Sequence, residues 1–318
     1  MMLKEKGFYK GVNLGGWFSQ CDYSKERLDG FITENDFKTI SEWGVDHVRI
    51  PFDYNIIENN DGTFIEEGFS RLARAVGLAR KYSMNIVLDL HKTAGFSFDN
   101  YGEDEHGFFE SEKYQDRFYK LWEEMAKRFG NDPQHIAFEL LNEVTDEQFI
   151  KKWNEIVSIC IPRIRKFAPD TLILVGSYHN NAADTVQYLD APYDNNVVYN
   201  MHCYDPLKFT HQGAYWTDAI DPAVRMTFEE SVCNEEYFEN LFSTAIRKAE
   251  KHNVPLYCGE YGVIDVVPPE ERVKWLRCIN SVYEKHGIGR AIWSYKEMDF
   301  SISAPEVDPV RSELIKLL

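Results

Sequence analysis

The sequence is poor in basic residues. Its 35 lysines and arginines face 52 aspartates and glutamates, which gives the 318 residues a formal net charge of −17. A surface of this sign repels phosphate groups, so the sequence argues against nucleic acids and anionic membranes as partners. A neutral or basic ligand is favoured instead, and we expect a monomer.

Long apolar runs are missing as well. No window approaches the roughly 18 consecutive apolar residues of a membrane span. The N-terminal "MMLKEKGFYKGVNLGGW" has no apolar segment of the kind that signal peptides carry. We therefore expect a cytoplasmic protein, or a secreted one if a signal peptide has been removed.

The sequence also lacks closely spaced pairs of cysteines. The chain has no C-x-x-C pair, and several cysteines fall in apolar segments. We expect reduced thiols packed as small hydrophobic side chains, not a disulfide framework. The six are Cys21, Cys160, Cys203, Cys233, Cys258 and Cys278.

No linker, low-complexity tract or short repeat interrupts the chain, so we expect a single domain over residues 1–318. What recurs is a short apolar strand followed by an amphipathic helix. These strands are apolar throughout, which is typical of parallel strands covered on both faces. The expected strands are 8–14, 47–52, 85–91, 135–143, 171–176, 196–204, 254–262 and 290–296.

Helices are expected between the strands. Residues 111–129 place apolar side chains at three- and four-residue spacing. Thr33 begins an N-cap pattern for a helix that ends near Gly44, while Pro268 opens another helix that Gly287 closes.

Eight strand–helix units over roughly 300 residues predict an α/β fold, a (β/α)8 TIM barrel. The competing fold is a doubly wound open sheet, which calls for a glycine-rich phosphate loop after a strand. The only glycine cluster, "NLGG", matches neither G-x-G-x-x-G nor a P-loop. The barrel is therefore the better prediction.

The active site of such a barrel lies at the C-terminal ends of its strands. Each polar residue there has a structural explanation, such as a helix cap or an ion pair. Their joint position at one end of the barrel is what predicts a site. They are Arg49, His91, Asn142, Glu143, His202, Tyr204, Glu260 and Trp293.

Two of these residues, Glu143 and Glu260, are carboxylic acids on strands expected to meet across the barrel. Glycoside hydrolysis uses such a pair: one carboxyl donates a proton to the leaving oxygen, and the other attacks the anomeric carbon. A separation of about 5 Å gives retention of configuration, and a wider one gives inversion. No metal-ligand set surrounds the pair in the sequence, so we expect neither a metal nor a cofactor.

Seven segments in order carry a family resemblance: "GVNLGGW", "HVRIPFDY", "LDLH", "FELLNEV", "MHCYDP", "YCGEYGV" and "AIWSYK". Together they resemble glycoside hydrolase family 5, the cellulase family of clan A. The resemblance runs from Gly11 to Phe300 and is strongest to small clostridial endoglucanases, including the final "YKEMDF". One departure is Val144, where many members have proline.

The resemblance implies roles for the residues at the strand ends. Glu143 matches the acid/base and Glu260 the nucleophile. Arg49 and Tyr204 match the groups that hold the nucleophile, which would keep it ionised. The wall of the subsite around the cleaved bond is matched by His91, Asn142, His202 and Trp293.

The resulting hypothesis is a retaining endo-β-1,4-glucanase that acts on cellulose-like or mixed-linkage β-glucan poly- or oligosaccharides. Activity as a β-1,3-glucosidase (exo-glucanase) or a β-mannanase stays open within the same chemistry. A metal-dependent hydrolase that uses His91 and His202 is a second class, although the usual H-x-H pair of the first strand is missing. A catalytically inactive sugar-binding barrel is a third.

Five further residues are not matched to a role by the resemblance. Glu139 is expected to be an interior carboxylate paired with a base. Trp17, Tyr54, Tyr101 and Trp216 are candidate sugar platforms, although aromatic side chains in loops also pack locally.

Overall fold

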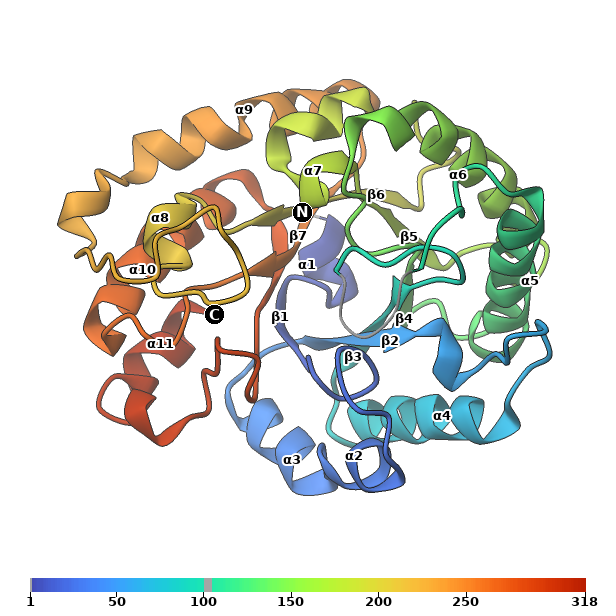
Figure 1. Cartoon of the computed structure of the whole chain (residues 1–318), viewed down its shortest axis with the longest axis horizontal. Helices are drawn as coiled ribbons and strands as arrows, with labels where there is room; N and C mark the ends of the chain where they lie inside the picture. Colours follow the sequence, from blue (N-terminus) through green and yellow to red (C-terminus); the bar gives the residue numbers. More distant parts are fainter. Residues whose placement is uncertain (1, 100–104) are drawn as a thin grey trace.

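The computed structural model describes residues 2–99 and 105–318 (Figure 1). Eight strands form a closed barrel in which each strand pairs in parallel with the next, and β1 pairs with β8. The predicted (β/α)8 barrel is confirmed. The strands are β1 (Lys10–Asn13), β2 (His47–Asp53), β3 (Asn85–Lys92), β4 (Ile136–Glu139), β5 (Leu172–Val175), β6 (Val197–Cys203), β7 (Leu256–Tyr261) and β8 (Gly289–Ile292).

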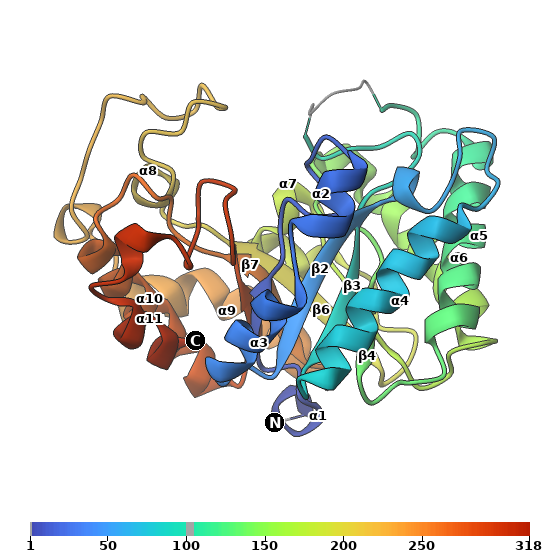
Figure 2. The ribbon, with the colours of Figure 1, turned by 90° about the horizontal axis from the view of Figure 1, so that it is seen from below.

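The longer helices form a ring outside the strands, and the short α1 lies at one end of the barrel (Figures 1 and 2). Leu3 of α1 and the nearby Phe8 pack with apolar side chains of the strands, including Val87 and Leu172. The N-terminal end of the barrel is therefore closed by the chain itself. The connections at the opposite end, the mouth of the barrel, hold the predicted site residues.

The α-helices are α1 (Met2–Lys6), α2 (Lys25–Gly30), α3 (Glu34–Glu42), α4 (Glu66–Lys81), α5 (Glu112–Phe129), α6 (Ile150–Arg165), α7 (Tyr178–Asn181), α8 (Leu207–Thr210), α9 (Glu235–His252), α10 (Pro269–His286) and α11 (Arg311–Leu317). None of the helices within the described ranges is long and apolar enough to cross a bilayer.

The predicted helix boundaries agree with the structure. Thr33 and Asp36 form a capping box at the start of α3. Proline stands at the first position of α10, and Gly287 ends that helix with a φ of 65°, a left-handed conformation that glycine adopts without steric cost. All six cysteines are free, and all except the half-buried Cys278 are buried.

The prediction for the fourth strand was wrong at its end. The regular strand β4 stops at Glu139 and not at residue 143. The chain stays hydrogen-bonded beyond it, because Leu140 donates to Leu174 O of β5 and Asn142 donates to Leu90 O of β3. One bond goes to β5 and the other to β3, so they do not form the regular ladder of a strand. Asn142 and Glu143 therefore lie in the segment after β4 and not in the strand itself. The other strands differ from the prediction by a few residues at their ends, and β8 ends at Ile292, just before Trp293.

Candidate active site

The two predicted carboxylates meet at the mouth of the barrel. Glu143 follows β4 and Glu260 lies in β7, and a carboxylate oxygen of one is within 4.8 Å of a carboxylate oxygen of the other. Both side chains are buried among other residues of the site, with 7% and 5% of their surface exposed. The separation falls in the range that supports retention in glycoside hydrolysis and is too short for the inverting geometry.

Each oxygen of the Glu260 carboxylate accepts a hydrogen bond. Arg49 donates to Oε1 from Nη1 at 2.8 Å, and the Tyr204 hydroxyl donates to Oε2 at 2.9 Å. Burial disfavours the ionised carboxylate, but the positive charges of His202, Arg49 and His91 and the Tyr204 hydrogen bond outweigh it and lower the pKa of Glu260 to about 2. Glu260 is therefore ionised at neutral pH.

Arg49 joins several carboxylates below the mouth. Its Nε and Nη2 donate to the two oxygens of Glu139 at 2.7 and 2.8 Å, and Nη2 lies 3.0 Å from Asp89 Oδ2. Burial opposes the charge of the guanidinium, but Asp89, Glu139 and Glu260 raise the pKa of Arg49 well above its usual value. The expectation that Glu139 pairs with a base inside the barrel is confirmed.

Glu143 has a different environment. His202 Nδ1 donates to Glu143 Oε1 at 2.7 Å and lies 3.8 Å from Glu260 Oε2. The second oxygen of Glu143 accepts a 2.7 Å bond from Asn180 Nδ2. The imidazole is thus placed between the two acids, and burial lowers the pKa of His202 less than Glu260 and Glu143 raise it.

Asn180 was not among the predicted site residues. This residue follows β5 in a run of three residues with positive φ: 49° at His179, 57° at Asn180 and 58° at Asn181. Backbone bonds from His179 to Thr145 O and from Asn180 to Val144 O fasten this turn to the segment after Glu143. Asparagine tolerates left-handed backbone better than most residues, so the "HNN" sequence is the only local signal for the turn.

The remaining predicted residues form one wall. The rings of His91 and Trp293 are stacked, with centroids 5.9 Å apart and an interplanar angle of 3°. Asn142 Oδ1 accepts a 2.9 Å bond from Arg49 Nη2, and its Nδ2 lies 3.4 Å from His91 Nε2. Burial lowers the pKa of His91, but Asp89, 2.6 Å from Nδ1, raises it to about 9. All eight predicted site residues therefore lie around one point.

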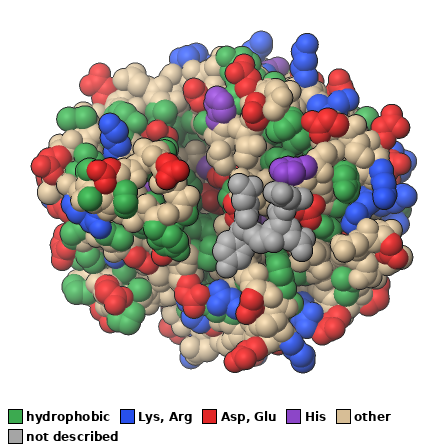
Figure 3. Space-filling model, in the orientation of Figure 1, with side chains coloured by type: hydrophobic (Ala, Val, Ile, Leu, Met, Phe, Trp, Pro, Cys, Tyr) green, Lys and Arg blue, Asp and Glu red, His purple; other side chains and the backbone are tan. Residues whose placement is uncertain are grey.

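The space-filling view shows the surface hollowed at this end of the barrel, beside the segment that carries α8 (Figure 3). Hydrophobic side chains form much of the visible wall of the hollow. Such a mixture of apolar surface and a few convergent polar groups is typical of a binding site for a small ligand or a sugar chain.

Two of the four candidate sugar platforms are buried. Trp17 is 0% exposed, stacks on Phe18 and donates from Nε1 to Leu28 O, so it belongs to the core. Tyr54 is also buried, and its hydroxyl donates to Glu105. Trp216 is 45% exposed and stays a candidate, while Tyr101 lies outside the described residues.

Over residues 5–299 the chain matches the family Cellulase (glycosyl hydrolase family 5). The chain belongs to glycosyl hydrolase family 5. It is 65% identical over 289 residues to "Cellodextrinase A" of Ruminococcus flavefaciens, which covers 91% of this chain and 86% of that protein. It is 38% identical over 338 residues to "Endoglucanase C" of Acetivibrio thermocellus, with 98% of each chain covered.

Solved structures agree with this membership. The Clostridial cellulose synthase subunit Z (CcsZ) from Clostridioides difficile superposes with a TM-score of 0.83 at 26% identity, covering 98% of this chain and 99% of that one. Thermotoga maritima Cel5A in complex with cellobiose gives 0.82 at 22% identity, with 98% of each chain covered, and so shares the fold. This family 5 chain is therefore a glycoside hydrolase with the architecture of its family.

Proposed function

We propose that this chain is a retaining endo-β-1,4-glucanase that hydrolyses cellulose-like or mixed-linkage β-glucans and their oligosaccharides. The observation that carries the proposal is the separation of the two carboxylates, whose closest oxygens lie within 4.8 Å. At this distance Glu260 reaches the anomeric carbon from one face while Glu143 reaches the glycosidic oxygen from the other.

The reaction has two steps. In the first, Glu143 donates its proton to the glycosidic oxygen as the bond to the anomeric carbon breaks, and an oxygen of Glu260 forms a bond to that carbon. In the second, Glu143 takes a proton from water, the water oxygen attacks the anomeric carbon, and the bond to Glu260 breaks. The configuration is inverted twice and hence retained.

The neighbouring residues serve these steps. Arg49 and Tyr204 hold Glu260 ionised and in place through bonds of 2.8 and 2.9 Å. Asn142 is placed to bind the sugar 2-hydroxyl, a contact that strengthens in an oxocarbenium-like transition state. The stacked rings of His91 and Trp293 present an apolar wall on which a sugar ring can pack.

The β-1,4 linkage is supported by the names of the relatives. Both an endoglucanase and a cellodextrinase align with nearly the whole chain, and the second is 65% identical. The relationship to a cellodextrinase favours soluble oligosaccharides among the substrates. The test is a product profile on cellotetraose, laminaritetraose and mannotetraose. Cleavage of cellotetraose alone supports the proposal, while preference for either of the others favours the β-1,3 or the mannan alternative.

The two other classes of function, a sugar-binding barrel and a metal-dependent hydrolase, are tested separately. A reducing-sugar assay on barley β-glucan, with Glu260→Ala as the control, separates an enzyme from a sugar-binding barrel, which would bind the glucan without cleaving it. A metal-dependent hydrolase would lose activity in EDTA. We expect no loss, because the proposed two-step reaction uses Glu143 and Glu260 alone and has no step that needs a metal.

A further inference from the structure

The imidazole of His202 has a second ring nitrogen, which does not face the two acids. Nδ1 lies 2.7 Å from Glu143 Oε1, whereas Nε2 points toward the segment after β5. There Asn181 Nδ2 lies 3.4 Å from Nε2, and within residues 2–99 and 105–318 this is the one hydrogen bond that Nε2 makes. Asn181 therefore holds the imidazole from the side that the acids leave open.

The backbone fixes the position of Asn181. The residue ends α7 and is the third in the run with positive φ, at 58°. The next residue, Ala182, pairs with His202 in a parallel β-bridge. Asn181 is fully buried, and Gly176 leaves room for its side chain, because a Cβ on that glycine would lie 2.2 Å from Asn181 Oδ1. The same turn thus brings Asn180 to the acid and Asn181 to the imidazole.

The other neighbour of Nε2 is backbone. A Cβ on Gly259 of β7 would lie 2.8 Å from His202 Nε2, so this glycine packs closely against the ring. Its N–H already donates to Asn200 Oδ1 at 2.9 Å. His202 is only 4% exposed, which leaves water little access to the ring. Asn181 is therefore the side chain that decides which charge state of the imidazole is satisfied at Nε2.

The Asn181 amide can satisfy both charge states of His202. Because Glu143 Oε1 accepts a hydrogen bond from Nδ1, that nitrogen carries a proton in either state. Neutral imidazole accepts at Nε2 and is served by the amide nitrogen, while imidazolium donates from Nε2 and needs an oxygen. A half-turn of the amide brings Oδ1 to Nε2, and the buried Oδ1 has no other hydrogen-bond partner in the described parts of the chain. The charged ring thus has an acceptor that no other group uses.

The charge of His202 acts on the nucleophile. Burial lowers the pKa of His202, but Glu260 and Glu143 raise it further, against a smaller opposing effect of Arg49. Burial raises the pKa of Glu260, and among the effects that lower it the charge of His202 is the largest, ahead of that of Arg49. The same charge also favours ionised Glu139 deeper in the barrel. A residue that helps His202 to keep its second proton therefore helps Glu260 to stay ionised.

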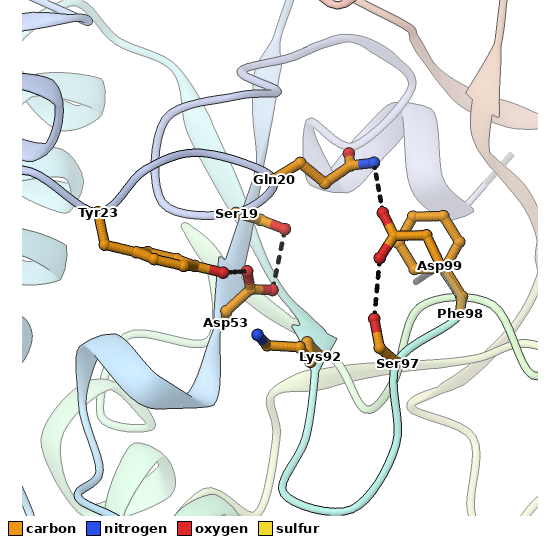
Figure 4. Close-up of a pocket in the computed structure, with 8 residues that line it drawn as sticks. All are labelled: Ser19, Gln20, Tyr23, Asp53, Lys92, Ser97, Phe98 and Asp99. Atoms are coloured by element: carbon orange, nitrogen blue, oxygen red, sulfur yellow. Dashed lines mark hydrogen bonds between the residues drawn. The ribbon is translucent and has the colours of Figure 1, made fainter. Parts of the chain in front are cut away.

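Another buried acid near the mouth belongs to a different group of residues. Asp53, at the end of β2, accepts hydrogen bonds from Ser19 Oγ and the Tyr23 hydroxyl (Figure 4). Burial raises the pKa of Asp53, and the strongest of the effects that lower it is the charge of His91 on β3. A substitution of Asn181 leaves these partners in place. A change in pH dependence that follows such a substitution is therefore not due to Asp53.

We propose that Asn181 is a positioning residue that holds the His202 ring through Nε2 and keeps the imidazole charged between the two acids. This inference rests on the proposed function and adds to it a fully buried residue that acts through its neighbour. Its consequence is that loss of the Asn181 amide changes the pH dependence of the reaction, and not only the stability of the fold.

The test is the pH profile of kcat/KM on 4-nitrophenyl β-cellobioside. Asn181→Leu keeps the shape of the amide but forms no hydrogen bond, so the second proton of His202 loses its acceptor. Glu260 then loses a positive neighbour and holds its proton to higher pH. We expect the acidic limb of the profile to move up by about one pH unit, and kcat/KM at the optimum to fall about tenfold. Asn181→Asp keeps an acceptor for Nε2 and should restore most of the activity, with an acidic limb close to that of the wild type.

A matched control separates backbone strain from the loss of the amide. Asn253 follows α9 at an exposed position with a φ of 52°, so Asn253→Leu makes the same change in the same left-handed conformation. It should alter neither kcat/KM nor the pH profile. Thermal unfolding shows whether each variant folds. If Asn181→Leu does not fold, Asn181→Gly decides the question, since glycine accepts the φ of 58° without strain and also lacks the amide.

Two results would overturn the inference. An acidic limb that stays at its wild-type position in the variant without the amide would assign Asn181 to packing alone. An equal shift in Asn181→Leu and Asn181→Asp would show that the hydrogen bond to His202 is not the cause. In both cases the wild type still cleaves β-glucan, so the proposed function stands. A wild type that cleaves neither the aryl cellobioside nor β-glucan would overturn the proposed function and, with it, this inference.

Discussion

Arg49 donates a 2.8 Å hydrogen bond from Nη1 to Oε1 of Glu260, and no part of the arginine is exposed to solvent. The same guanidinium holds Asp89 and Glu139. One cation thus contacts three buried carboxylates, and removal of a partner from a buried ion pair is strongly destabilising because it leaves uncompensated charge.

Arg49→Met should therefore impair both stability and activity. We expect the free energy of unfolding to fall by about 3–5 kcal/mol. We also expect the acidic limb of the kcat/KM profile to move to higher pH, because the charge that favours ionised Glu260 is gone. Urea titration and pH–rate profiles measure the two effects. Arg247→Met, at an exposed position on α9, is the matched control and should change neither.

Glu260 should make stability depend on pH in the acidic range. Its pKa is about 2 in the folded protein against an ordinary value of 4.5, so the folded state binds its proton less readily than the unfolded state. The stabilisation is complete above pH 4.5 and is lost as the pH falls from there toward 2. Denaturant unfolding at pH 5 and pH 3 should show a smaller loss in Glu260→Gln than in the wild type. The same loss in both proteins would mean that other acids account for it.

Glu143→Gln should discriminate between leaving groups. The variant cannot donate a proton, so cellobiosides with poor leaving groups should lose about a hundredfold or more in kcat/KM. The first step with a dinitrophenyl leaving group needs little protonation and should be almost unaffected. Steady-state rates on a series of aryl cellobiosides measure this dependence, and an equal loss across the series would contradict the role of Glu143 as the acid.

Asn180→Gly tests the residue that only the structure revealed. Glycine accepts the φ of 57° without strain, so the variant removes the 2.7 Å bond to Glu143 Oε2 and leaves the backbone free to keep its path. We expect about a tenfold loss on poor leaving groups and a smaller loss on activated ones, because the acid is less well positioned. His179→Gly, at the neighbouring exposed position of the same turn, should leave both rates unchanged.

The fold was predictable because its signals are local and repeated. Each of the eight apolar runs is a strand of the barrel, and the residues at their ends lie together because a parallel barrel places all carboxyl ends at one mouth. The resemblance added the roles of individual residues. The end of the fourth strand was not predictable, since Leu140 and Asn142 bond to different neighbours and the apolar pattern continues without a break.

Burial and turn geometry were not accessible from the sequence either. Trp17 follows a glycine pair near the mouth, as a sugar platform would, yet it packs on Phe18 inside the core. Asn180 reaches Glu143 only because successive left-handed residues redirect the chain after β5.

The ion pairs of Arg49 also bear on what happens halfway through the catalytic cycle. When the sugar esterifies Glu260, the negative charge of that residue disappears from beside the guanidinium. Arg49 keeps its contacts of 2.7–3.0 Å with Asp89 and the two oxygens of Glu139, and these contacts hold the guanidinium in the same position. When water releases the Glu260 carboxylate in the second step, the guanidinium is already in position to pair with it. The site therefore needs no rearrangement before the next turnover.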